Sequence, residues 1–215
     1  MLLFVAVSLF AGGLVAAAGL GVPPLNLLNH EFAGAFTALG APVWVLVSRG
    51  LARRRSEDDA LWRGLAGVMA LTAGVLAVHI PWDGAHLGCQ TDDGVGLFLT
   101  TWVPAGVLTT VAGVVAARAS ALRTVAAVGA ALLLLAAHDG GQILFGVRLV
   151  DPLLGSLEAF DQRADLERAP TWFAERAWVL LTAGMLWAGH QWRRDRSRRA
   201  GLGVIAVVWM ISTVF

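Results

Sequence analysis

The sequence predicts an all-α fold, a polytopic transmembrane helical bundle of six or seven helices with an interfacial amphipathic helix on its outer side. Three observations favour it. Only 14% of the 215 residues are charged, whereas soluble domains carry about 25%. Apolar residues gather in runs of about 20, the length at which a helix crosses the hydrocarbon core. Arginines gather between those runs. We therefore expect residues 1–215 to form one lipid-covered domain.

Seven apolar runs are expected to span the membrane. The first ends at Pro23-Pro24 and lacks a basic start and a cleavage site, so it is interpreted as a span rather than a removable signal. The third is expected to end at Pro81, whereas Pro104 within the fourth is tolerable among neighbouring helices. The expected spans are Leu2–Gly21, Leu27–Ser48, Gly64–Ile80, Val95–Ala117, Thr124–Phe145, Phe173–Trp192 and Gly201–Phe215.

The segment Gly146–Trp172 is the longest polar stretch. Its apolar residues recur at helical spacing with acidic residues between them, which indicates an amphipathic helix on the outer membrane surface. A connector folded over the mouth of the bundle is the alternative. The apolar positions are Val150, Leu153, Leu154, Leu157, Phe160 and Ala164.

Arginine divides the connecting segments into two faces. One face carries twelve arginines, and the other carries four arginines with eleven carboxylates. The positive-inside rule makes the twelve-arginine face cytoplasmic. We expect a bacterial inner membrane, because Arg, Ala, Gly and Val dominate as in GC-rich genomes. The N-terminus is expected outside, and so is the C-terminus if the seventh run spans. The twelve are Arg49, Arg53, Arg54, Arg55, Arg63, Arg118, Arg123, Arg193, Arg194, Arg196, Arg198 and Arg199.

Composition also limits the possible functions. The chain has no lysine, so it cannot form a retinal-type Schiff base. The single cysteine, Cys89, excludes an internal disulfide. His190 has no histidine partner at matching depth for haem. The lipid bilayer is the expected partner, and no nucleic acid is expected.

Small residues recur at four-residue spacing in two of the expected spans. Such stripes let helix backbones approach closely within a bundle, and a dimer face is the alternative. The stripes are Gly13, Ala17 and Gly21 in the first span, and Ala66, Ala70 and Gly74 in the third.

Ionisable residues inside a membrane are functional candidates, because each costs about 2.5–3.5 kcal/mol at the helix centre. Counting from the nearest arginines at about 1.5 Å per residue, three spans bring polar groups to the outer third of the membrane. The candidates are His30, Glu31, His79, His138 and Asp139. The connector above them adds Asp83, His86, Cys89, Asp92 and Asp93.

Three interpretations of this cluster remain open. Imidazole nitrogen and carboxylate oxygen suit a divalent metal such as zinc, which could support hydrolysis. A proton or cation path could run through His79, His138 and Asp139. Alternatively, the side chains are polar residues wetted at the interface. His138-Asp139 interrupts an apolar run, and the following Gly140-Gly141 would permit a helix break that lines a cavity.

Short motifs along most of the chain resemble the bacterial multi-spanning membrane region that precedes peptidase MA-like (zincin-like) domains. They are Asn29-His30-Glu31-Phe32, Cys89 with Asp92, Gly96 and Phe98, Pro104, and Gln142 with Phe145. The peptidase itself is absent, because a zincin requires His-Glu-x-x-His and His30-Glu31 continues as Phe-Ala-Gly.

The resemblance implies a membrane module without a peptidase. We expect it to anchor or scaffold an extracytoplasmic domain or protein partner, without enzyme activity of its own. The alternative is a membrane-embedded metal-binding enzyme, or a proton- or cation-handling transporter, that uses the outer cluster.

Overall fold

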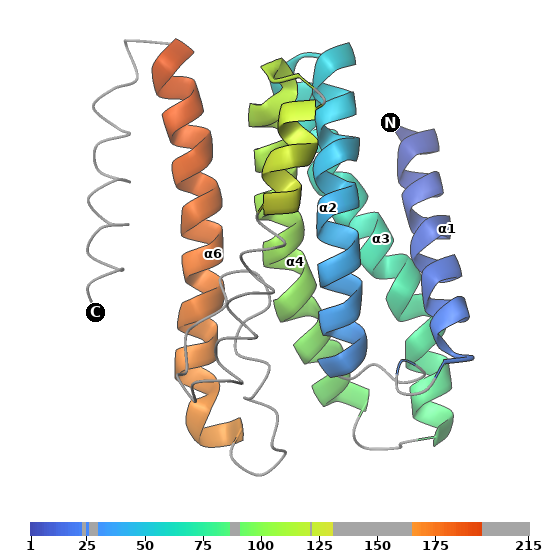
Figure 1. Ribbon diagram of the computed structural model, residues 1–215. Helices are drawn as coiled ribbons and strands as arrows, with labels where there is room; N and C mark the ends of the chain where they lie inside the picture. The colour runs from blue at the N-terminus through green and yellow to red at the C-terminus, as the bar shows by residue number, and fades with distance from the viewer. Residues whose placement is uncertain (23–24, 26–29, 87–90, 121, 131–164, 195–215) are drawn as a thin grey trace.

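The structure, a computed structural model, is a bundle of long helices lying side by side (Figure 1). It describes residues 1–22, 25, 30–86, 91–120, 122–130 and 165–194. Within these ranges residues 122–130 are also helical, and no strand occurs. The main elements are α1 (Leu2–Gly19), α2 (His30–Arg54), α3 (Glu57–His86), α4 (Thr91–Val115), the 3-10 turn η2 (Ala116–Arg118) and α6 (Asp165–Arg194).

Four of the described helices are long and apolar enough to cross a membrane. They cover Leu2–Gly19, Phe32–Arg54, Glu57–Ala85 and Gly94–Arg118, and so correspond to the first four expected spans. The helix α6 has 30 residues, but it is not among these four. The structure thus confirms an all-α bundle with four such helices, and the total of six or seven remains a prediction.

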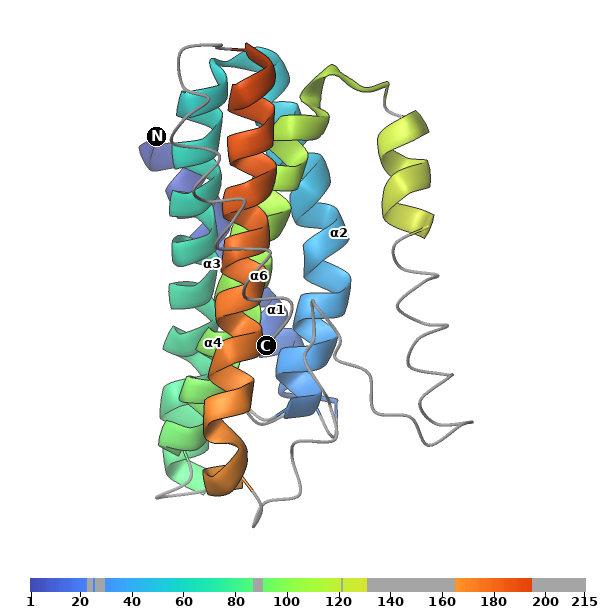
Figure 2. The same cartoon turned by 90° about the vertical axis from the view of Figure 1, so that its left-hand side faces the viewer.

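The helix α4 occupies the middle of the described bundle. It packs against α2, α3 and α6, whereas α1 packs mainly on α3. The view in Figure 2 shows α6 lying along α4. The core consists mainly of side chains from α2, α3 and α4, including Phe32, Phe36, Val75, Phe98 and Trp102.

Glycines bring α1 and α3 into backbone contact. A Cβ built on Gly74 would collide with the Leu9 carbonyl oxygen and lie 2.9 Å from the Gly13 nitrogen. The stripe expected in α3 therefore packs as predicted at Gly74. In α1 the expected stripe is not the buried one, since Ala17 and Gly21 are exposed. The buried positions are Ser8, Gly12, Ala16 and Gly19. Both the expected and the observed stripe of α1 consist of small residues, so their spacing alone could not identify the face that packs on α3.

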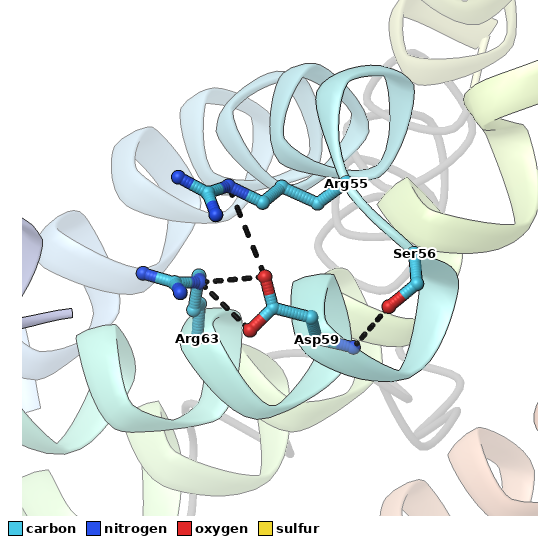
Figure 3. Close-up of polar contacts among 4 residues, drawn as sticks. All are labelled: Arg55, Ser56, Asp59 and Arg63. Atoms are coloured by element: carbon cyan, nitrogen blue, oxygen red, sulfur yellow. Dashed lines mark hydrogen bonds and ion pairs between the residues drawn. The ribbon is translucent and has the colours of Figure 1, made fainter.

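The connection between α2 and α3 is a tight turn at Arg55–Ser56 (Figure 3). The Ser56 hydroxyl accepts a hydrogen bond of 3.3 Å from the backbone N–H of Asp59, which caps the start of α3. The Asp59 carboxylate accepts two bonds of 2.9 and 2.8 Å from Arg63 Nε and lies 3.8 Å from Arg55 Nε. Most of the segment between the second and third expected spans, Arg49–Arg63, is consequently helical.

Several helix ends differ from the expected ones. The helix α3 continues through Pro81 to His86, so Pro81 does not terminate it. The helix α6 begins at Asp165, which assigns residues 165–172 to α6 rather than to a separate surface helix. Hydropathy locates the apolar part of a helix, whereas polar turns at either end remain helical. The rest of the predicted surface helix, most of the fifth span (131–145) and the seventh span lie outside the described residues.

The expected placement of Met1 and of the arginine-rich turn on opposite sides is wrong. The order of contacts along the two helices shows that α1 runs parallel to α3: Phe4 is next to Gly67, and Leu9 is next to Gly74. Because α3 begins at the arginine-rich turn, Met1 lies towards that same end of the bundle (Figure 1). Two expected spans separate Met1 from this turn, and an even number of crossings returns the chain to the same side.

Candidate functional site

The structure places one predicted site residue, His79, inside the bundle core. Its side chain on α3 is 0% exposed. The ring of Phe32, from α2, meets the imidazole in an edge-to-face arrangement with 4.4 Å between ring centroids. His79 is therefore enclosed by protein and is not the wetted interfacial residue of the third interpretation.

Four aromatic rings form a contact series that begins beside His79 and continues to Trp102. Phe32 and Phe36 come from α2, and Phe98 and Trp102 from α4. On each helix the four-residue spacing places both rings on one face. Phe36 lies 5.3 Å from Phe98 and 4.8 Å from Trp102, measured between ring centroids. We call these four residues the aromatic layer. His79 lies near the end of α3 that is opposite the arginines.

Asp83 is the charged neighbour of His79. The distance from His79 Nδ1 to Asp83 Oδ1 is 3.7 Å, and the two side chains are 0% and 1% exposed. This distance is longer than a hydrogen bond, and neither ring nitrogen has a hydrogen-bond partner among the described residues. An unsatisfied buried polar group costs about 1–3 kcal/mol. The imidazole of His79 is thus buried at an energetic cost in this arrangement.

The sequence analysis missed this pairing because it ended the third span at Pro81. With α3 continuous, His79 and Asp83 stand four residues apart and share one face of the helix. Proline lacks the N–H that would bond to the carbonyl of Ala77, one turn earlier, yet membrane helices tolerate such interruptions. The spacing His-x-x-x-Asp was the available signal.

The other predicted site residues are described only in part. His30 and Glu31 begin α2, next to Phe32 and hence at the same end of the bundle as His79, but their side chains are not described. His138 and Asp139 lie outside the described residues. Among the side chains that are described, no group of three or more His, Cys, Asp or Glu residues could hold a metal ion. The metal hypothesis therefore remains a prediction.

A second polar junction lies at the arginine-rich end. His190 Nε2 of α6 is 2.7 Å from Glu57 Oε2, with both side chains largely buried. Arg118 Nη2, in η2, lies 3.5 Å from the other oxygen of Glu57. The junction ties α6 to the start of α3 across 133 residues of sequence, so no local spacing could have shown it.

Arg176, one of the four arginines outside the arginine-rich face, is a buried charge. It belongs to α6, and only 4% of it is exposed. Since it precedes His190 by 14 residues, it lies about 21 Å along the helix from the polar junction. Its burial follows from the early start of α6, which places Arg176 within a long helix packed on α4.

Comparisons with protein-family models, curated proteins and solved structures gave no match to this chain. Its function is accordingly argued from its own residues.

Proposed function

We propose that the chain is a multi-pass protein of the bacterial cytoplasmic membrane. The outward face of α3 carries the proposal. Trp62 is 68% exposed and Trp82 is 36% exposed. They stand 20 residues apart, or about 30 Å along a helix, which is the thickness of the hydrocarbon core. Tryptophan favours both membrane–water interfaces. The exposed positions between them carry no charge: Met69, Ala73, Ala77, Ile80 and Pro81.

The neighbouring helices present similar apolar surfaces. Phe10 and Leu14 of α1 and Leu39 and Val43 of α2 are all more than half exposed. Such residues occur singly on soluble proteins, but a surface formed by several helices requires an apolar cover. Lipid is the cover that also explains the length of these helices.

The sidedness follows from the charges. Arg53, Arg54, Arg55, Arg118 and Arg123 are exposed and belong to the connections at the arginine-rich end. Applied to that end, the positive-inside rule makes it cytoplasmic. Because Met1 lies towards the same end, the N-terminus is then cytoplasmic too. We retain six or seven spans as the proposed total, which puts the C-terminus outside if Gly201–Phe215 spans.

Labelling with a membrane-impermeant maleimide tests this orientation. In intact spheroplasts, native Cys89 should react, because it joins α3 to α4 at the end opposite the arginines. In a Cys89→Ser background, Ser56→Cys at the α2–α3 turn should react only after the cells are lysed. Because Ser56 is exposed, its protection in intact cells would reflect the bilayer rather than burial. Reaction of that cysteine in intact spheroplasts would reverse the orientation.

We further propose that this bundle anchors or scaffolds an extracytoplasmic domain or partner. The resemblance to membrane regions that precede zincin-like domains supports this function, and an outward C-terminus would suit it. The alternative is a metal site formed by His30, Glu31, His79, His138 and Asp139. It is supported by the burial of His79 at the same end of the bundle as the first turn of α2.

Metal analysis of detergent-purified protein separates the two functions. An anchor should contain no stoichiometric zinc after dialysis, and His138→Ala should leave the metal content unchanged. A zinc ion that survives dialysis in the native protein and is lost in His138→Ala would overturn the pure anchor. His190→Ala is the matched control, because His190 belongs to the opposite end of the bundle.

A further inference from the structure

Arg49 is a buried cation for which the described residues provide no carboxylate partner. It belongs to α2, and only 7% of it is exposed. Its Nη2 donates a hydrogen bond of 2.7 Å to the carbonyl of Ala119, whereas its Nε has no hydrogen-bond partner in the described part of the chain. The ion pairs found at this end of the bundle use Arg55, Arg63 and Arg118 instead. Because buried charges in proteins are normally paired, an anion supplied from elsewhere would satisfy Arg49.

The bond to Ala119 joins α2 to the connection that leaves α4. Ala119 directly follows η2, which packs on α2, and its backbone is extended. Arg118 precedes Ala119, and Arg123 follows it by four residues. Arg53 lies one turn after Arg49 on the same face of α2. All three of these arginines are exposed, so three accessible guanidinium groups come to the place where α2 meets this connection.

This group of arginines lies at the proposed membrane boundary. Arg49 precedes the turn Arg55–Ser56 by six residues, and Trp62 follows that turn by six residues. Both therefore lie about 9 Å from the turn along their helices. Because Trp62 marks the cytoplasmic edge of the hydrocarbon core in the proposed placement, Arg49 lies at that edge. Arg53 is one turn closer to the cytoplasm, at the level of the lipid headgroups.

An exposed apolar stripe leads along α2 to Arg53. It consists of Leu39, Val43 and Leu46, which are exposed and recur at helical spacing. Gly50 continues the stripe, and a Cβ built on it would meet nothing within 4 Å, so the surface between Leu46 and Arg53 is open. A free phosphate ion would contact the arginines alone, whereas a phospholipid would also cover this stripe with an acyl chain.

We propose that Arg53, Arg118 and Arg123 bind the phosphate of an anionic phospholipid whose acyl chain lies along α2. Guanidinium groups match phosphate oxygens in a two-bond geometry. Arg49 supports the site from beneath: it holds the connection against α2, and its buried charge is screened less than the exposed ones. Arg118 is the weakest contributor, because it lies 3.5 Å from Glu57. The site goes beyond the anchoring function and rests on the proposed placement in the membrane.

Native mass spectrometry of the whole protein in a neutral detergent tests the choice of ligand. Phosphatidylglycerol, which carries a net negative charge, should bind about tenfold or more tightly than zwitterionic phosphatidylcholine. Inorganic phosphate at the same concentration should not displace it, because a free ion lacks the acyl chain. Equal affinities for the two lipids would overturn the anionic headgroup site. Displacement by inorganic phosphate would overturn the lipid as the ligand.

Charge-removing variants test the location of the site. Arg53→Gln and Arg123→Gln should each weaken phosphatidylglycerol binding about fivefold, and the double variant about 25-fold. Arg54→Gln is the matched control, because Arg54 is exposed on the same turn but lies about 140° around α2 from Arg49. Its effect should be less than about twofold, since exposed charges at a distance are screened. An equal loss in Arg54→Gln would show attraction to the whole charged end and would overturn the site.

Two substitutions of Arg49 test its supporting role. Arg49→Gln should weaken phosphatidylglycerol binding, and Arg49→Lys should restore most of it because the buried charge is kept. A lysine variant that binds as weakly as the glutamine variant would overturn the role of the charge. If Arg49→Gln does not fold, Arg53→Gln and Arg123→Gln still decide the site. All of these measurements are made in detergent, so their failure would leave the anchoring function and the maleimide test of orientation unaffected.

Discussion

Replacing Trp102 with alanine is expected to lower the free energy of unfolding by about 3 kcal/mol, the low end of the range for truncating large aromatic residues. The Trp102 ring, a member of the aromatic layer, is fully buried. It packs edge-to-face on Phe36, and a Cβ on Gly40 would lie only 3.1 Å from its Cζ3 atom.

The low end of the range applies because lipid replaces water as the solvent. In water, burying the indole would contribute a transfer term as well as packing. In a bilayer the separated helices remain in an apolar medium, so helix association depends mainly on van der Waals packing. The expected loss is then the cavity term, about 24 cal/mol per Å³. Trp102 Nε1 has no hydrogen-bond partner among the described residues, so its removal adds no broken bond.

Two variants complete the measurement, which is reversible unfolding in mixed detergent micelles. Trp102→Phe preserves a ring and removes the unbonded N–H, so it should cost about 1.5 kcal/mol or less. Trp62→Ala, at an exposed position on α3, should change stability by about 0.5 kcal/mol at most. A loss for Trp102→Ala no larger than that for Trp62→Ala would show that α2 and α4 do not meet through this ring.

The first four helices were predictable because hydropathy reports directly on the solvent around a helix. The runs beginning at Leu2 and Gly64 mark helices whose apolar residues must meet lipid or protein. Helix ends were less predictable. Glu57–Arg63 is helical because Ser56 caps the segment and Asp59 pairs with Arg63, and neither contact changes mean hydropathy. The N-terminus was misplaced through the count of crossings, not through the pattern itself.

In the candidate site, too, the features set within one helix were open to prediction, whereas the contacts between helices were not. The position of His79 along α3 followed from its distance to Arg63, because helix rise is constant. Its partner Asp83 was only four residues away, but the assumption that Pro81 ends the helix concealed it. The enclosing rings of Phe32 and Phe98 depend on which faces of α2 and α4 meet. Such faces are set by packing across the bundle and have no signature in a single helix.

Gly74→Ala is expected to release α1 from the bundle, with a loss of about 2–3 kcal/mol, near the upper limit for added volume in a packed core. The new methyl group would collide with the Leu9 carbonyl and lie 2.9 Å from the Gly13 nitrogen. These are backbone atoms of α1, so no rotamer change can relieve the contact, and the helices must separate. Because α1 packs mainly on α3, little else would hold it in place.

Gly84→Ala provides the matched comparison, since Gly84 is on the same helix and a Cβ there meets nothing within 4 Å. Alanine is the better helix former by about 0.5–1 kcal/mol, so Gly84→Ala should be neutral or slightly stabilising. Unfolding in mixed micelles measures both changes. A disulfide between cysteines at Phe4 and Gly67, introduced in a Cys89→Ser background, should form less readily once Gly74 is replaced. Equal stability of Gly74→Ala and Gly84→Ala would mean that the stripe Ser8, Gly12, Ala16 and Gly19 does not pack against α3. The small residues of α1 would then remain available as a face for a second copy of the chain.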